Sequence, residues 1–107
     1  MISNYEFTVI FDANEDKTKA GLELVESLFA KHSVEVSKKD DMGVRTLAYI
    51  INKQEKGHYF YFEIKVDGSD IKDMSRALEL SSDVLKYLFI NPEKNWGLLW
   101  QTSTVLH

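Results

Sequence analysis

The stretch from His58 to Val66, which reads HYFYFEIKV, decides the fold of this chain. Apolar and more polar side chains alternate along it, which is the pattern of a β-strand with one buried face and one wetter face. The predicted core-facing set is Phe60, Phe62, Ile64 and Val66, and the predicted outward set is Tyr59, Tyr61, Glu63 and Lys65. The two charged residues mark the outward face as the wetter one. We therefore expect a sheet with one open face.

Three further strands are predicted around this one. They span residues 5–11, 34–53 and 84–90. Gly43 is expected to mark a bulge in the long middle segment, and Gly57 is expected to supply the positive φ of a hairpin turn over residues 54–57. The inward face of the strand 84–90 stays undecided, because both of its alternating sets contain large apolar side chains. Pro92 ends that strand.

Two amphipathic helices are predicted between the strands. Asn14 is the expected N-cap of the first, ahead of two acidic residues that suit the positive end of the helix dipole. Its apolar stripe is Leu22, Val25, Leu28, Phe29 and His32. Gly21 lies on the same side, where a missing side chain lets a helix approach a sheet closely. Gly68 and Ser69 are expected to cap the second helix. Its buried stripe is Ile71, Met74, Ala77, Leu78 and Ser81.

The predicted element order is β-α-β-β-α-β. With right-handed crossovers this order gives an α+β, ferredoxin-like sandwich, in which a four-stranded antiparallel sheet carries both helices on one face. Residues 1–92 form this domain, and residues 93–107 form a C-terminal tail. Trp96 and Trp100 of the tail would be costly in water, so they either pack back on the domain or dock on another chain. Since all predicted elements precede Pro92, the domain is expected to fold without the tail.

Composition limits the classes of function. The chain has 107 residues, with 13 Lys and Arg against 17 Asp and Glu, a net charge of −4. A mild negative charge argues against holding a polyphosphate by bulk electrostatics, although a local basic patch is still compatible with it. There is no cysteine, which excludes disulfides, thiolate metal sites and thiol nucleophiles. No apolar run approaches the roughly 20 residues that span a bilayer. We expect a cytoplasmic chain without a membrane segment.

No pattern in the sequence indicates catalysis. His32, His58 and His107 are scattered, without a second ligand at metal-binding spacing. There is no glycine-rich phosphate loop and no serine in a nucleophile-elbow pattern. We therefore predict no catalytic residue, no cofactor, no metal and no small-molecule substrate. The open sheet face, with Tyr59 and Tyr61, and the tail tryptophans Trp96 and Trp100 are instead the candidate partner-protein surfaces.

Several motifs together resemble one family. Residues 43–53 read GVRTLAYIINK and are followed by Gly57-His-Tyr59, which is similar to the G-x-R-x-L-A-Y-P-I-x-K…G-x-Y pattern of the bacterial small-subunit ribosomal protein S6 family. The pair Tyr5-Glu6 resembles the Tyr-Glu pair near that family's N-terminus. Residues 83–86, DVLK, resemble its fourth-strand entry, D-x-V-x-R. The resemblance spans residues 5 to about 91, with matching element order.

The resemblance implies a ferredoxin-like protein without enzymatic activity. Members of that family pair with ribosomal protein S18 and bind the central domain of the small-subunit rRNA, and many of them are acidic. Carried over position by position, the family's basic positions fall on Arg45, Lys53 and Lys86, and its N-terminal aromatic falls on Tyr5. These four residues are the predicted rRNA contacts, and the two charges at positions 45 and 86 are expected to be exposed on strands.

Several positions depart from the family pattern. Ile50 stands where the family has proline, and residues 2–4 lack the arginine that commonly precedes the Tyr-Glu pair. Lys86 replaces an arginine and loses its planar fork for phosphate, and Asn91 replaces a basic residue. We therefore expect docking on a partner protein to contribute more than direct RNA contact to positioning this chain. The alternative hypothesis is a self-associating ferredoxin-like module with a regulatory or small-ligand role. A small dimeric enzyme of this architecture ranks third.

Overall fold

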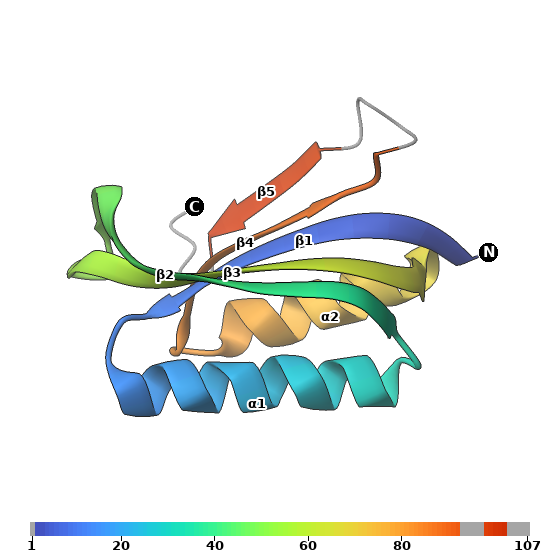
Figure 1. The fold of residues 1–107 in the computed structure, drawn as a ribbon, viewed down its shortest axis with the longest axis horizontal. Helices are drawn as coiled ribbons and strands as arrows, with labels where there is room; N and C mark the ends of the chain where they lie inside the picture. The colour runs from blue at the N-terminus through green and yellow to red at the C-terminus, as the bar shows by residue number, and fades with distance from the viewer. Residues whose placement is uncertain (1, 93–97, 103–107) are drawn as a thin grey trace.

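The computed structural model describes residues 2–92 and 98–102, the latter as backbone. Its elements are β1 (Ile2–Asp12), α1 (Glu15–Lys31), β2 (Glu35–Ile51), β3 (Gln54–Asp67), α2 (Gly68–Leu80), β4 (Val84–Ile90) and β5 (Leu98–Thr102). The strands form one antiparallel sheet in the order β2-β3-β1-β4-β5. Both helices pack against the same face of this sheet (Figure 1). The predicted ferredoxin-like order is confirmed, and β5, which comes from the tail, extends the sheet by one strand.

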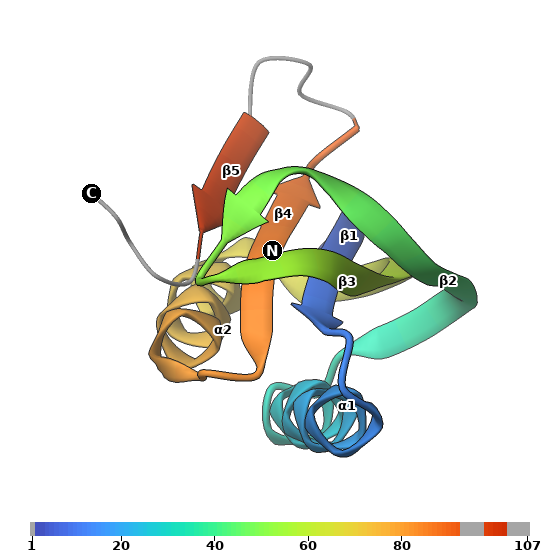
Figure 2. The same ribbon diagram turned by 90° about the vertical axis from the view of Figure 1, so that its left-hand side faces the viewer.

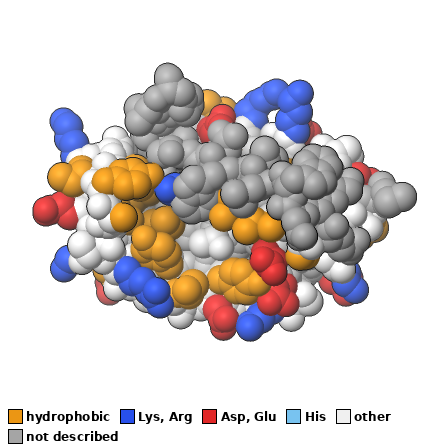
Figure 3. All heavy atoms as spheres, turned by 90° about the horizontal axis from the view of Figure 1, so that it is seen from above, with side chains coloured by type: hydrophobic (Ala, Val, Ile, Leu, Met, Phe, Trp, Pro, Cys, Tyr) orange, Lys and Arg blue, Asp and Glu red, His pale blue; other side chains and the backbone are white. Residues whose placement is uncertain are grey.

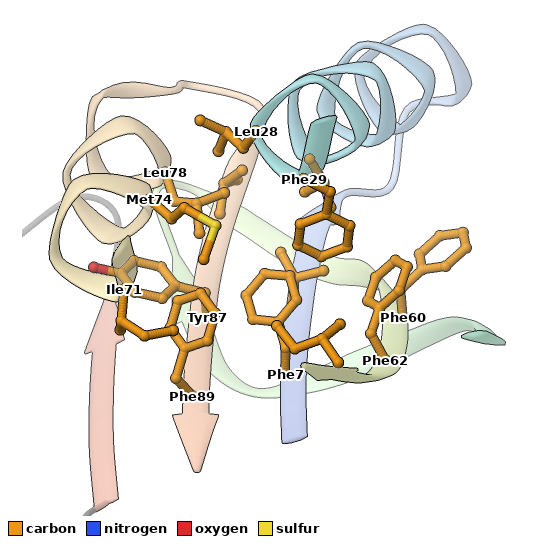
Figure 4. Packing of buried hydrophobic residues seen from close by; sticks show 14 of the residues in the cluster. Phe7, Leu28, Phe29, Phe60, Phe62, Ile71, Met74, Leu78, Tyr87 and Phe89 are labelled. Atoms are coloured by element: carbon orange, nitrogen blue, oxygen red, sulfur yellow. The ribbon is translucent and has the colours of Figure 1, made fainter. Parts of the chain in front are cut away.

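The main core fills the space between the sheet and the helices (Figure 4). The predicted inward set of β3 is buried there in full. Phe7 of β1 lies at its centre, with its ring centroid 4.4 Å from that of Phe89 and 5.7 Å from that of Phe62. Offset aromatic contacts of this kind add to the stabilisation from buried apolar area. Among the described residues, no helix lies on the opposite face of the sheet, which is called the open face below.

Helix α1 begins as predicted. The Asn14 side chain accepts the backbone N–H of Asp16 at 3.0 Å. Gly21 lies directly over Phe11, so that a methyl group there would come within 2.3 Å of the ring. The predicted cap of helix α2 at Gly68 and Ser69 is wrong. Asp67 is the N-cap, and its side chain accepts the N–H of Ser69 at 3.0 Å. Gly68 has no side-chain acceptor to offer, whereas the Asp67 carboxylate accepts from both the amide and the hydroxyl of Ser69.

The turn between β2 and β3 also differs from its prediction. It lies at Asn52 and Lys53, whose φ values of 51° and 65° are both left-handed, as a two-residue hairpin turn requires. Gly57 instead lies within β3, where an added Cβ would come 2.4 Å from a methyl carbon of Ile10. The glycine therefore serves close packing rather than the turn. At Gly43, φ is 81° beside a shift in strand register, which confirms the predicted bulge.

A second irregularity settles the faces of β4. Ile10 pairs with Lys86 and Phe11 pairs with Val84, so Leu85 is an extra residue in the ladder. Val84 therefore joins Tyr87 and Phe89 in the main core. Leu85 and Lys86 belong to the open-face side, where Leu85 packs with Ile10. A single alternation could not describe this strand.

Candidate functional site

The end of the β2–β3 hairpin, residues 44–57, folds over the open face and is called the hairpin arm below. Figure 2 shows β2 arching above the sheet toward β4. Leu47 and Ile51 from the arm are buried against Ile10 and Leu85 of the sheet, which forms a second, smaller core. Hydrophobic side chains gather on the open face at this end of the molecule (Figure 3). The arm therefore packs on the open face.

Lys86 lies beneath this arm. Its Nζ donates a hydrogen bond to the Tyr49 hydroxyl at 2.7 Å, and the residue is only 7% exposed. The prediction that Lys86 is an exposed strand charge is therefore wrong. The reason is long-range, since the hydroxyl that binds its ammonium lies 37 positions earlier in the chain, and β5 pairs with it from the other side. No local pattern around residue 86 carries that information.

The other predicted RNA contacts occupy different places. Arg45 is exposed on the arm, with its guanidinium carbon 5.8 Å from the centroid of the Tyr59 ring. Lys53 is exposed at the turn that ends the arm. Tyr5 lies on the helix side of the sheet, half-buried against the main core and close to Gly68. The arm thus carries Arg45, Lys53 and the Tyr49 hydroxyl that binds Lys86, whereas Tyr5 lies on the other side of the sheet.

The open face itself carries an acidic cluster, which consists of Glu6, Asp40 and Glu63. Glu6 of β1 and Asp40 of β2 flank β3 on opposite sides, opposite Glu63 and Tyr61 respectively. The Tyr61 hydroxyl donates to Glu63 Oε2 at 3.0 Å. Partial burial, this hydrogen bond and the neighbouring carboxylates raise the pKa of Tyr61 from 10.0 to about 12. The cluster is not predictable from the sequence, because its members come together only through strand register.

Tyr59 and Tyr61 lie half-buried on the predicted outward face of β3, beside cations. Arg45 lies near the Tyr59 ring, and the Lys38 ammonium is 5.9 Å from the centroid of the Tyr61 ring. Trp96 falls outside the described residues, as does the side chain of Trp100. The backbone of Trp100 lies in β5, opposite Leu88 of β4. At that point the backbone of the tail packs back on the sheet.

Two of the three histidines each lie beside a carboxylate. His32 Nδ1 lies 2.9 Å from Asp70, and His58 Nε2 lies 2.6 Å from Asp41. The hydrogen bond with His58 holds the pKa of Asp41 below its usual value. Within residues 2–92 and 98–102, no three potential metal ligands gather, and no helix is long and apolar enough to cross a membrane. His107 falls outside this part of the chain.

Together, the fold and these surfaces define a small ferredoxin-like binding protein, with an acidic open face and a hairpin arm that carries exposed cations. Comparison with known proteins identifies its family. The family model for Ribosomal protein S6 matches residues 4–91. The chain belongs to the ribosomal protein S6 family.

Individual relatives agree with this assignment. The small ribosomal subunit protein bS6 of Treponema denticola is 33% identical over 90 residues, which cover 84% of this chain and 97% of the relative. The bS6 protein of Synechococcus elongatus is 35% identical over 82 residues, 77% of each chain. The crystal structure of 30S ribosomal protein S6 from Thermotoga maritima superposes with a TM-score of 0.74 at 19% identity. It covers 84% of this chain and 87% of that one, which supports the shared fold.

Proposed function

We propose that the chain is a structural protein of the small ribosomal subunit that binds small-subunit rRNA together with ribosomal protein S18. In this role it catalyses no reaction, and it works in the cytoplasm as part of the ribosome. Family membership gives the subunit. The observation that carries the rest is the separation of charge between the acidic cluster on the open face and the exposed cations of the hairpin arm.

The acidic cluster suits a basic protein partner. Glu6 and Glu63 are half-buried side by side, and a cationic side chain docked there would relieve their repulsion. Half-buried tyrosines beside such a cluster are typical of the central part of a protein interface. The proposed partner contacts are Tyr59, Tyr61, Trp96 and Trp100. A basic partner would also supply positive charge that this chain, at −4, lacks.

The hairpin arm suits RNA phosphates. Arg45 and Lys53 are both exposed on it. The Arg45 Nε donates to the carbonyl oxygen of Met42 at 3.3 Å, and its charge stays available to a phosphate at the surface. Each neutralised phosphate adds about 0.7–0.9 to the logarithmic salt slope of affinity. The two arm cations proposed as phosphate contacts, Arg45 and Lys53, therefore predict weak binding of the protein alone, with a slope of about two or less. Tyr5 is the remaining proposed contact, on the other side of the sheet.

The test is a salt titration of binding to a central-domain rRNA fragment, with and without purified S18. We expect weak binding alone, and tighter binding with a steeper slope when S18 is present. Arg45→Ala should lower the slope in the presence of S18 by about 0.7–0.9. Glu23→Gln, on the outer side of α1, is the control and should change nothing. If S18 adds nothing to RNA binding, the proposal is wrong, and a stable homodimer without RNA affinity would favour the self-associating alternative.

A further inference from the structure

Lys86 and Tyr49 join the sheet to the hairpin arm by a charged hydrogen bond. The ammonium lies 2.7 Å from the hydroxyl oxygen but 5.1 Å from the ring centroid, so it sits at the hydroxyl end of the side chain. Hydrogen bonds with an ionised partner are about twice as strong as neutral ones. Tyr49 is 56% exposed and Lys86 is 7% exposed. The contact therefore runs from the outer surface of the arm to a covered point on β4.

Two further features hold the hairpin arm against the open face near Lys86. Leu47 and Ile51 bury apolar surface on Ile10 and Leu85. Gly57 leaves the room that this approach needs, since a Cβ there would come 2.4 Å from Ile10 and 3.2 Å from Leu47. The apolar contacts are non-directional, whereas the hydrogen bond fixes one geometry. The Tyr49–Lys86 pair is thus a directional contact between the arm and β4.

This closure conflicts with a phosphate contact at Lys86. A phosphate would have to reach an ammonium that is covered and already donates to Tyr49, and opening the arm would expose the second core to water. Arg45 and Lys53, on the same arm, are exposed and need no such opening. Building on the proposed function, we propose that Tyr49 and Lys86 form a latch that positions the RNA-binding arm. Lys86 is then a positioning residue and not a contact to RNA.

The latch itself is tested on the full chain without RNA. Tyr49→Phe removes the hydroxyl, Lys86→Met removes the ammonium while keeping an apolar stem, and the double variant removes both. We expect amide hydrogen exchange over residues 44–57 to become several-fold faster in each single variant, and no faster again in the double variant, because paired residues are not additive. Lys65→Met, which removes an exposed lysine of β3, is the matched control and should leave the arm unchanged. Unchanged exchange in both single variants would overturn the latch.

The positioning role is tested by salt titration of RNA binding with S18 present. Tyr49→Phe and Lys86→Met should weaken binding by a similar factor, up to about tenfold, with the salt slope unchanged. The opposite result, in which Lys86→Met lowers the slope by about 0.7–0.9 and Tyr49→Phe has no effect, would make Lys86 a phosphate contact and overturn the proposal. If wild-type protein binds no RNA although the latch variants open the arm, the proposed function fails and the latch stands.

Discussion

Glu6 and Glu63 lie directly opposite each other on β1 and β3, half-buried on the open face of the sheet. Directly opposed like charges destabilise a sheet. Asp40 adds a third carboxylate near Tyr61, and Lys38, opposite Glu63 on β2, compensates only part of the charge. An arrangement that costs stability in the isolated chain is understandable where a cation from another molecule relieves it. The acidic cluster is therefore expected to lower the stability of the isolated chain and to raise its affinity for a cationic partner.

Glu6→Gln separates these two effects. The variant removes one of the opposed charges while keeping the size of the side chain. We expect the free energy of unfolding of the isolated protein to rise by about 0.2–1 kcal/mol, measured by urea denaturation. Affinity for S18, measured by calorimetry, should fall. Glu23→Gln on α1 is the control for both measurements. Loss of stability together with unchanged affinity would contradict the role of the cluster.

The pKa of Tyr61 gives a second test of the same cluster. Its phenol should ionise at about pH 12 rather than 10.0, which a titration of the tyrosine ring signals by NMR can follow. Because the folded pKa lies above the unfolded one, the group contributes stability that is fully present below about pH 10. That stability is lost as the pH rises from about 10 to 12. Glu6→Gln should move the pKa back toward 10.0, and an unchanged value would mean that Glu6 does not influence Tyr61.

Gly21→Ala tests the contact between α1 and the sheet. In an exposed helix position alanine is favoured over glycine by about 1 kcal/mol. Here its methyl carbon would come 2.3 Å from the Phe11 ring, which is fully buried. Overpacking of this kind typically costs about 1–3 kcal/mol. We therefore expect net destabilisation in urea denaturation. Ala20→Gly, at an exposed position of the same helix, calibrates the propensity, and a stabilised Gly21→Ala would contradict the close packing.

Structure is predictable from this sequence where a single side chain has one strong local preference. The faces of β3 followed from alternation that is interrupted nowhere between Phe60 and Val66, and the cap at Asn14 followed from its own hydrogen-bonding chemistry. The predicted position of the hairpin turn is wrong, because it requires a positive φ at Gly57. Asn52 and Lys53 adopt that conformation instead. Gly57 is needed because a side chain there would clash with Ile10, which is distant in sequence.

The candidate site was less predictable because it depends on long-range contacts. The position of Lys86 within a strand indicated an exposed charge. The bulge at Leu85 decides which face Lys86 lies on, and the hairpin arm supplies the Tyr49 hydroxyl that binds its ammonium. Neither feature leaves a signal in the sequence around residue 86. The acidic cluster joins residues from three strands, so it requires the register as well as the fold. The predicted exposure of Arg45 is confirmed, because the arm that carries it is exposed along most of its length.

Removal of residues 93–107 tests the boundary at Pro92. Both helices and both apolar cores precede Pro92, so the truncated chain should still fold. It should lose β5, which pairs with β4 from Lys86 to Ile90. The hydrogen bonds lost contribute about 0.5–1.5 kcal/mol each but are largely offset by the freed conformational entropy, so we expect the melting temperature to fall by less than about 8 °C.

The larger effect of this truncation should be on association. Without β5, the strand β4, which reads VLKYLFI and holds one charged residue, becomes an edge of the sheet. Apolar edge strands pair with other chains, so the truncated protein should self-associate in sedimentation velocity, more strongly than the full chain at the same concentration. Removal of residues 103–107 alone keeps β5 and is the matched control. A truncated chain that stays as dispersed as the control would show that β5 does not protect β4, and one that fails to fold would place the tail within the domain.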